Sequence, residues 1–176
     1  MRKWMMGAAV ATALVSTRAF ATEVKIDDLI VAKTIPPTQL DAELDAVKAF
    51  YQFWNTGDES LLKAAIAPNF IDHTLPSGRP QGPQGPAFAS AHFRAAVPDL
   101  GVEVRKMVVT DGYATVHMVF RGHFTGSFGK VKGHGQAIDF IATDLLKVTD
   151  GRVTDNWHIE DNLTLLSQMG VAKIAQ

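Results

Sequence analysis

The sequence predicts an α+β fold, in which helices from the first half of the chain pack on one face of a curled antiparallel sheet formed by the second half. Apolar residues recur every three or four positions before the Pro/Gly-rich loop at 76–86, and every second position after residue 102. The 176 residues are 47% hydrophobic, which suits a single domain with one core.

The first residues of the chain have the pattern of a secretory signal peptide. Arg2 and Lys3 precede the apolar run WMMGAAVATALV, and Ala19-Phe20-Ala21 has the small-x-small form of a signal peptidase site. The alternative, a transmembrane anchor, requires about 20 apolar residues, and this run has about twelve. We therefore predict that residues 1–21 are removed, and that the protein is periplasmic or secreted with no membrane attachment afterwards.

The composition excludes several classes of function. The predicted mature chain has 14 Lys and Arg against 18 Asp and Glu, a net charge of −4, and no basic run. Nucleic acid is therefore not an expected partner, because its binding depends on clustered Lys and Arg. The absence of cysteine excludes thiol catalysis, thiolate metal sites and iron–sulfur clusters.

Three helices are predicted in the first half. Residues 22–37 show no helical period and close on Pro36-Pro37, which predicts an extended arm before a domain at 38–176. Thr38 is expected to cap the first helix, whose apolar residues are Leu40, Leu44, Val47, Tyr51 and Trp54. The second helix is predicted from about Asp58 to Ala67, and the third over PAFASAHFRAAV, from Pro86 to Val97.

Four strands and a short helix are predicted in the second half. The strands span approximately Val102–Thr110, Tyr113–Phe124, Gln136–Thr149 and Arg152–Asp161. The Asp-Gly pairs at 111–112 and 150–151 predict tight hairpins. A closing helix, NLTLLSQMG, should place Leu163, Leu166 and Met169 over the sheet. The segment FIDHT is too short to assign.

Five segments, taken in order, resemble the SnoaL-like polyketide cyclases, also described as ester cyclases, of the nuclear-transport-factor-2-like superfamily. They are FYQFWNTGD, FIDHT, FRAAVPDL, FRGHFTGSFG and DLLKVTDGRVTDNWHIEDNLTLLSQMG, and they span most of residues 49–171. The resemblance implies a cone-shaped curved sheet with N-terminal helices enclosing an apolar pocket, a homodimer or homotetramer, and no metal or organic cofactor. In the best known members it also implies an intramolecular aldol condensation with an aspartate on the last strand as acid/base.

One segment departs from the family pattern. The family often reads Arg-Gly-Thr-His-Thr-Gly, whereas this chain has Arg121-Gly122-His123-Phe124-Thr125-Gly126. Adjacent residues of a strand face opposite sides, so His123 cannot take the place of the family's histidine.

The stretch WHIEDN contains the first catalytic candidate. By strand alternation Trp157, Ile159 and Asp161 share one face, and His158 and Glu160 share the other. We expect the face with Trp157 and Ile159 to be the covered one, which makes Asp161 the predicted acid/base, in agreement with the resemblance. The alternative role for Asp161 is to cap the following helix. His158 and Glu160 are predicted to be a solvated or interface pair.

Two further residues are catalytic candidates. His73 in FIDHT aligns with a family histidine near the pocket mouth; it would hydrogen bond a substrate carbonyl or enolate oxygen, or be an ordinary loop histidine. Its neighbour Asp72 is predicted to face water. Asp144 shares a strand face with Phe140 and Leu146, where a carboxylate must be paired or protonated, either as a second catalytic group or in a structural role.

The predicted substrate-binding residues are mostly aromatic. Trp157, Phe50, Trp54 and Phe140 would shape the cavity, although aromatic residues at these spacings also form cores. His92 is a candidate for the rim, and His117 for the cavity wall, with the solvent side as the alternative for both. No His or Glu pair stands at metal-ligand spacing on a helix, so no metal site is expected.

The sequence therefore predicts an exported, cofactor-independent cyclase or isomerase that transfers protons next to a carbonyl of a small apolar substrate. The alternative is a non-catalytic ligand-binding or interaction module, because one fold hosts many functions. Epoxide hydrolysis is a third possibility, which needs an Asp-Arg-Asp cluster that the predicted strands do not supply.

Overall fold

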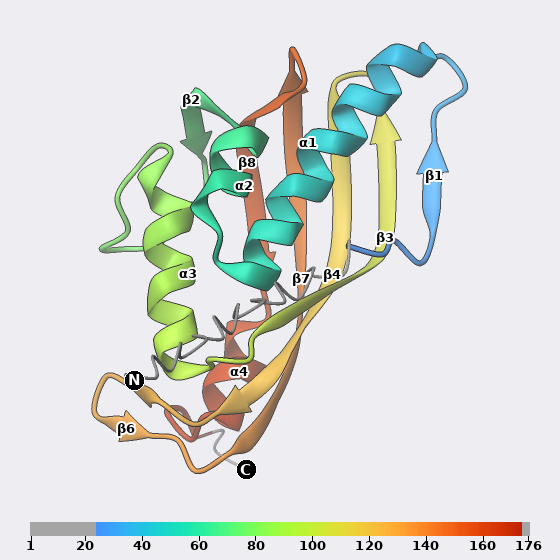
Figure 1. Cartoon of the computed structure of the whole chain (residues 1–176). Helices are drawn as coiled ribbons and strands as arrows, with labels where there is room; N and C mark the ends of the chain where they lie inside the picture. Colours follow the sequence, from blue (N-terminus) through green and yellow to red (C-terminus); the bar gives the residue numbers. More distant parts are fainter. Residues whose placement is uncertain (1–23, 174–176) are drawn as a thin grey trace, which may run out of the picture.

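The computed structural model describes residues 24–173, so the predicted signal peptide at 1–21 lies outside the described part. Four helices are present: α1 (Pro37–Thr56), α2 (Glu59–Ala65), α3 (Gln84–Ala96) and α4 (Asn162–Gln168). Figure 1 shows them beside a long twisted sheet, which confirms the predicted α+β class. No helix between residues 24 and 173 is long and apolar enough to cross a membrane.

Helix α1 begins one residue earlier than predicted. Its N-cap is Pro36, which makes no side-chain capping hydrogen bond, so the expected cap at Thr38 is wrong. Proline suits these first positions because its fixed φ is already helical and its missing N–H would have no partner there. The helix ends as predicted at Gly57, whose φ of 73° is accessible at low cost to glycine.

The main sheet has six strands in the order β1-β3-β4-β7-β8-β2. Its central strands are β3 (Gly101–Thr110), β4 (Tyr113–Phe124), β7 (Gln136–Thr149) and β8 (Arg152–Glu160), which confirms the four predicted antiparallel strands. A separate two-stranded hairpin joins β5 (Ser127–Phe128) to β6 (Val131–Lys132).

Two edge strands were missed by the sequence analysis. The arm contains β1 (Leu29–Val31), which pairs in parallel with β3. The segment FIDHT belongs largely to β2 (Ile66–Asp72), which pairs in parallel with β8. Helix α2 consequently ends at Ala65 and not at Ala67, and Pro68 lies in the strand. An edge strand tolerates proline because the missing N–H can be on its unpaired side.

A β-bulge in β8 decides which side chains face the helices. Val153 pairs with Val148 of β7, but the next pair is Asp155 with Lys147, so Thr154 is an extra residue on β8. Beyond a bulge of one residue, the alternation of the strand continues in the opposite phase. Asn156 and His158 are therefore on the same face as Val153, and the predicted assignment of the two faces of WHIEDN is wrong.

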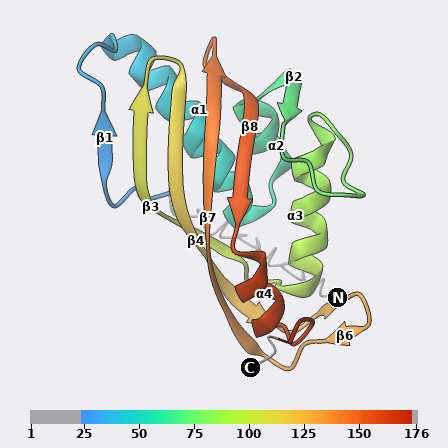
Figure 2. The same cartoon turned by 180° about the vertical axis from the view of Figure 1, so that it is seen from behind.

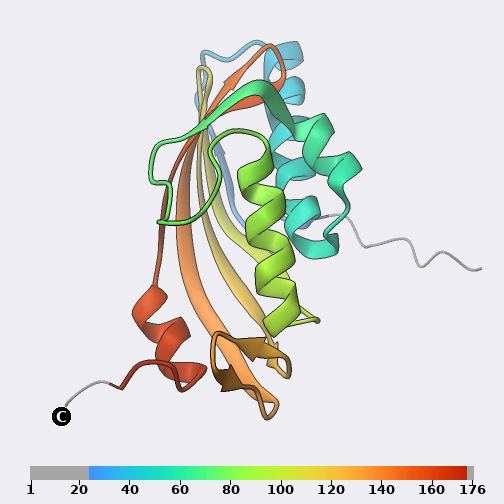
Figure 3. The same cartoon turned by 90° about the vertical axis from the view of Figure 1, so that its left-hand side faces the viewer.

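Helices α1, α2 and α3 cover one face of the sheet, which we call the inner face (Figure 3). Helix α4 and the β5–β6 hairpin lie together at one end of the long strands. The core between these layers contains fully buried side chains, and burial of one such large apolar side chain contributes about 1.5–3 kcal/mol. The largest are Tyr51, Phe50, Phe53, Phe124 and Leu100.

The opposite face, which we call the outer face, carries no helix over the central strands (Figure 2). Ile141, Leu145 and Ile159 are 48%, 40% and 77% exposed there. Ile159 was expected on the covered face, and the bulge at Thr154 explains the difference. In the closing helix Leu165 and Met169 are buried while Leu163 is exposed, so the predicted packing is wrong for Leu163.

Candidate active site

An aromatic cavity lies between the helices and the inner face of the sheet. Its volume is about 550 Å³, within the range of small-molecule sites. Apolar aromatic rings from α1, β2, α3, β4, β5 and β7 form most of its wall, and ring pairs such as Phe120 and Phe140, 5.2 Å apart, stack. The phenylalanine and tryptophan residues of the wall are Phe50, Trp54, Phe70, Phe88, Phe93, Phe120, Phe128 and Phe140.

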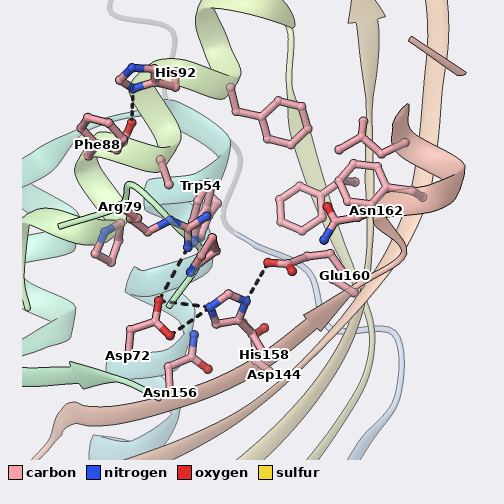
Figure 4. A pocket seen from close by; sticks show the side chains of 18 of the residues that line it. Trp54, Asp72, Arg79, Phe88, His92, Asp144, Asn156, His158, Glu160 and Asn162 are labelled. Carbon is pink, nitrogen blue, oxygen red and sulfur yellow. Dashed lines mark hydrogen bonds and ion pairs between the residues drawn. The ribbon is translucent and has the colours of Figure 1, made fainter. Parts of the chain in front are cut away.

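The polar end of the cavity is built around His158. Its Nδ1 lies 2.7 Å from Glu160 Oε1, and its Nε2 lies 3.1 Å from both carboxylate oxygens of Asp72 (Figure 4). His158 and Glu160 are on the same face of β8, and Asp72 ends the neighbouring strand β2. His158 is 7% exposed and Asp72 is 6% exposed, so this pairing is sheltered from water.

These contacts fix His158 in its charged form. Burial alone would lower its pKa, but the hydrogen bonds to Asp72 and Glu160 outweigh that effect and raise the pKa to about 10. Burial likewise opposes ionisation of Asp72 and Glu160, yet their hydrogen bonds to His158 hold both pKa values below the usual range. The cluster is therefore an imidazolium between two carboxylates at neutral pH.

Asp72 also ties the Pro/Gly-rich loop to this cluster. Its Oδ1 accepts a hydrogen bond from the Thr74 N–H, and Arg79 Nη1 lies 3.6 Å from Oδ2. The side chain of Gln81 bonds the backbone N–H and C=O of Asp72, both at 2.8 Å. Arg79 lines the cavity from this loop and places a second positive charge at the polar end.

Asp144 is a carboxyl group on the inner face of β7, opposite His158 in the strand register. The hydroxyl of buried Tyr51 donates a 2.7 Å hydrogen bond to Asp144 Oδ2. Burial raises the pKa of Asp144 to about 7, against the opposing effect of the Tyr51 hydrogen bond. Burial and the neighbouring carboxylate raise the pKa of Tyr51, which stays a neutral donor. Asp144 can therefore both accept and return a proton near neutral pH.

Five of the predicted site residues line the cavity. Phe50, Trp54 and Phe140 form its aromatic wall, Asp144 lies at its polar end, and His92 is on α3 at its edge. The Nδ1 of His92 bonds the Phe88 carbonyl at 2.8 Å, an interaction within one helix. Their contacts with a substrate stay predictions.

Asp161, the predicted acid/base, is the N-cap of α4. Its Oδ1 accepts the Thr164 N–H at 3.0 Å and its Oδ2 accepts the Thr164 hydroxyl at 2.7 Å. These hydrogen bonds lower the pKa of Asp161, which favours a fixed carboxylate and not a proton carrier. The placement on the covered face is wrong because the bulge at Thr154 reverses the alternation, and the alternative role as a cap is confirmed.

The remaining predicted residues lie away from the cavity wall. The ring of His73 stacks on Trp157, with ring centroids 4.2 Å apart, and its Nε2 lies 2.7 Å from Asp155. Trp157 was expected to line the pocket, but the bulge turns it to the outer face. His117 bonds the Thr143 hydroxyl on that same face at 2.9 Å, so its solvent-side alternative is the one observed.

The departure at Arg121–Gly126 also has a structural explanation. His123 is exposed and its Nδ1 lies 2.7 Å from Asp99, while Phe124 is fully buried in the core. A Cβ at Gly122 would be 2.4 Å from Val97, so glycine allows the end of α3 to approach β4. His123 therefore joins β4 to the segment after α3 and does not contribute to the cavity.

Sequence reasoning missed the residues that form the polar end. His158 and Glu160 were assigned to the solvated face and Asp72 to water, and all three assignments are wrong. One available signal was the run Thr154-Asp155-Asn156, three polar residues that interrupt the alternation of β8 where the bulge occurs. Among the described residues, no group of His, Cys, Asp or Glu side chains has the arrangement to hold a metal ion.

Comparisons with known proteins follow the same fold. The family model "SnoaL-like polyketide cyclase" matches residues 44–169. A provisionally assigned polyketide cyclase from Bacillus cereus ATCC 10987 is 36% identical, over 86% of this chain and 96% of that one, with a TM-score of 0.79. IdmH from Streptomyces antibioticus, also provisionally assigned as a polyketide cyclase, is 28% identical over 73% and 99%, with a TM-score of 0.66.

A more distant structure supports the fold alone. A protein from Catenulispora acidiphila DSM 44928 with a ketosteroid isomerase-like fold, in complex with trimethylamine, is 18% identical over 73% of this chain and 94% of that one. Its TM-score is 0.57. No curated protein sequence matches the chain.

Proposed function

The chain belongs to the SnoaL-like polyketide cyclase family, and from this premise we propose that it is a cofactor-independent cyclase or isomerase in which Asp144 transfers protons next to a substrate carbonyl. One observation carries the proposal: a buried carboxyl group with a pKa near 7 is at the polar end of an aromatic cavity. General acid/base catalysis is most effective when the pKa of the group is close to the working pH.

Asp144 in its carboxylate form would take a proton from the carbon next to the carbonyl, leaving an enolate. In a cyclisation, the enolate carbon then attacks a second carbonyl of the same molecule, forming one carbon–carbon bond and an alkoxide. The proton held by Asp144 returns to that alkoxide. In an isomerisation, it returns to another carbon of the enolate. The hydroxyl of Tyr51 supports both steps, because it stays neutral and donates to the carboxylate throughout.

The charge of His158 would stabilise the enolate. Asp72 and Glu160 bind both ring nitrogens, so the imidazolium cannot rotate or lose its proton readily. A fixed positive charge in a water-poor cavity stabilises developing negative charge without reorganisation. His158 therefore acts by its field, since both of its N–H groups already have partners.

The wall of the cavity favours a flat, apolar carbonyl compound. Phenylalanine and tryptophan rings stack on or meet the edges of aromatic groups at little cost in conformational entropy. The assignments of the Bacillus cereus and Streptomyces antibioticus relatives suggest a polyketide as the substrate class. Export to the periplasm or exterior and assembly into a homodimer or homotetramer remain predictions from the sequence.

A deuterium-exchange assay tests the proposal without knowledge of the natural substrate. The hydrogens next to the carbonyl of 2-tetralone, a flat aromatic ketone, exchange in D₂O when an enolate forms. We expect the wild-type protein to accelerate this exchange, and Asp144→Asn to lower the rate by about 10²–10⁴-fold, the usual contribution of a general base. Asp161→Asn is the matched control and should keep the wild-type rate, because Asp161 caps α4.

Two results would contradict the proposal. An Asp144→Asn protein with the wild-type exchange rate would remove Asp144 from the reaction. A wild-type protein that binds 2-tetralone but does not accelerate exchange would favour the non-catalytic binding module instead.

A further inference from the structure

Asn156 is a buried polar residue that the proposed proton transfer does not use. It is on the inner face of β8 between Val153 and His158, is 6% exposed, and lines the cavity. Figure 4 shows it in the polar group that includes Asp72 and Asp144. Within residues 24–173, its side-chain oxygen Oδ1 accepts no hydrogen bond.

The sheet itself does not require an amide at this position. The backbone carbonyl of Asn156 accepts the His73 N–H at 2.8 Å, and the strand pairs with β7 and β2 through backbone groups. A buried acceptor without a partner destabilises the fold, and most such groups in proteins are hydrogen bonded. The Asn156 oxygen therefore has the chemistry of a group that a bound molecule completes.

The bound molecule must supply the donor. Both N–H groups of His158 are directed to Asp72 and Glu160, and the Tyr51 hydroxyl is directed to Asp144. The free capacity at the polar end is on oxygen acceptors, and the rest of the wall is aromatic. A ligand that fits both features is an aromatic molecule with a hydroxyl group.

We infer that Asn156 is a specificity-determining residue, whose Oδ1 accepts a hydrogen bond from a hydroxyl group of the aromatic ligand. The inference rests on the proposed function for the assumption that substrate occupies this cavity. It adds a requirement that acid/base chemistry does not impose, because a proton next to a carbonyl can be removed from molecules with or without a hydroxyl group.

The affinity of two matched probes tests the inference. Both 2-naphthol and 2-methoxynaphthalene carry an oxygen on the same flat ring system, but only 2-naphthol donates a hydrogen bond. In calorimetric titrations the wild-type protein should bind 2-naphthol about tenfold more tightly or better, since an unsatisfied buried acceptor gains its partner. Asn156→Leu, which has a similar size and no acceptor, should bind the two probes equally.

Control variants separate this inference from others. Asn162→Leu removes an amide from the exposed edge of the same cavity and should keep the preference for 2-naphthol. Asp144→Asn should also keep it, because binding is measured without turnover, so failure of the proposed proton transfer would not affect this result. If Asn156→Leu does not fold, Asn156→Ala removes the same acceptor without an added side chain.

Three results would overturn the inference. They are equal binding of the two probes by the wild-type protein, failure of 2-naphthol to bind, and a preference for 2-naphthol that survives in both Asn156 variants.

Discussion

The two faces of strand β8 carry chemically similar residues in opposite circumstances. On the inner face, His158 is buried between two carboxylates and has a pKa of about 10. On the outer face, Trp157 stacks against His73, which lies 2.7 Å from the single carboxylate of Asp155. One histidine is a fixed cation in a cavity, and the other is part of a partly exposed surface pair.

The difference shows that the position of one bulge selects the chemistry of the site. Thr154 is the extra residue that places Asn156, His158 and Glu160 inside and Trp157 and Ile159 outside. A strand without this bulge but with Val153 still inside would direct Trp157 and Ile159 into the cavity. The aspartate that then follows at 161 would face the substrate, whereas in the structure it caps α4.

The same substitution in the two histidines should separate the faces most strongly. His158→Gln removes the positive partner of two buried carboxylates, which typically destabilises a protein by about 3–5 kcal/mol. His73→Gln breaks a partly exposed pair and should cost less than about 1 kcal/mol. Urea unfolding of both variants measures the difference. Equal losses of unfolding free energy would mean that the Asp72–His158–Glu160 cluster is not sheltered as described.

The pH dependence of stability should sharpen this contrast. Because the folded-state pKa of His158 is raised from 6.5 to about 10, its contribution is fully present below about pH 6.5 and is lost as the pH rises toward 10. The wild-type protein should therefore lose unfolding free energy from pH 7 to 10 by more than His158→Gln does. Parallel curves for the two proteins over this range would contradict the raised pKa.

Deletion of Thr154 should have a smaller effect. Removal of the extra residue would make β8 pair regularly with β7 while Val153, Asn156 and His158 stay on the inner face. We expect a folded protein, destabilised by about 1 kcal/mol, that still accelerates exchange of 2-tetralone. An unfolded protein, or loss of exchange in a folded one, would show that another residue is the extra one or that the bulge shapes the cavity directly.

The outer face should matter for assembly and little for the fold of one subunit. The predicted homodimer or homotetramer could bury Ile141, Leu145 and Ile159, which are exposed in the single chain. Ile159→Lys should change the stability of the subunit by about 0.5 kcal/mol or less, but sedimentation velocity should show dissociation. Leu163→Lys on α4 is the comparison and should leave the assembly intact. A wild-type protein that sediments as a monomer would contradict the prediction.

Much of the fold was predictable because local signals determine it. Period-two alternation gave the four central strands within one or two residues, and the turn at 150–151 has the positive φ angles that Asp-Gly favours. The edge strands β1 and β2 were not predictable in the same way. Each pairs in parallel with a strand distant in sequence, and FIDHT is too short to carry a period of its own.

The site was predictable only where alternation is unbroken. Strand β7 has no bulge between Ile138 and Leu146, so the apolar stripe correctly placed Asp144 on the inner face. In β8 the same reasoning failed after Thr154, because a bulge leaves no strong signal in residue type. Asp72 was missed because its burial depends on contacts with His158 and Arg79, which are far from it in sequence or held in an irregular loop.

The carboxyl groups of Asp144 and Asp161 provide the most direct measurement of the account. In ¹³C NMR of protein labelled at the aspartate carboxyl carbons, Asp144→Asn and Asp161→Asn spectra assign the two signals. A single pH titration should then show Asp144 with an inflection at about 7, and Asp161 with an inflection below 3.8. An Asp144 signal that titrates near 3.8, or an Asp161 signal that titrates near 7, would contradict the assignment of the acid/base to the inner face.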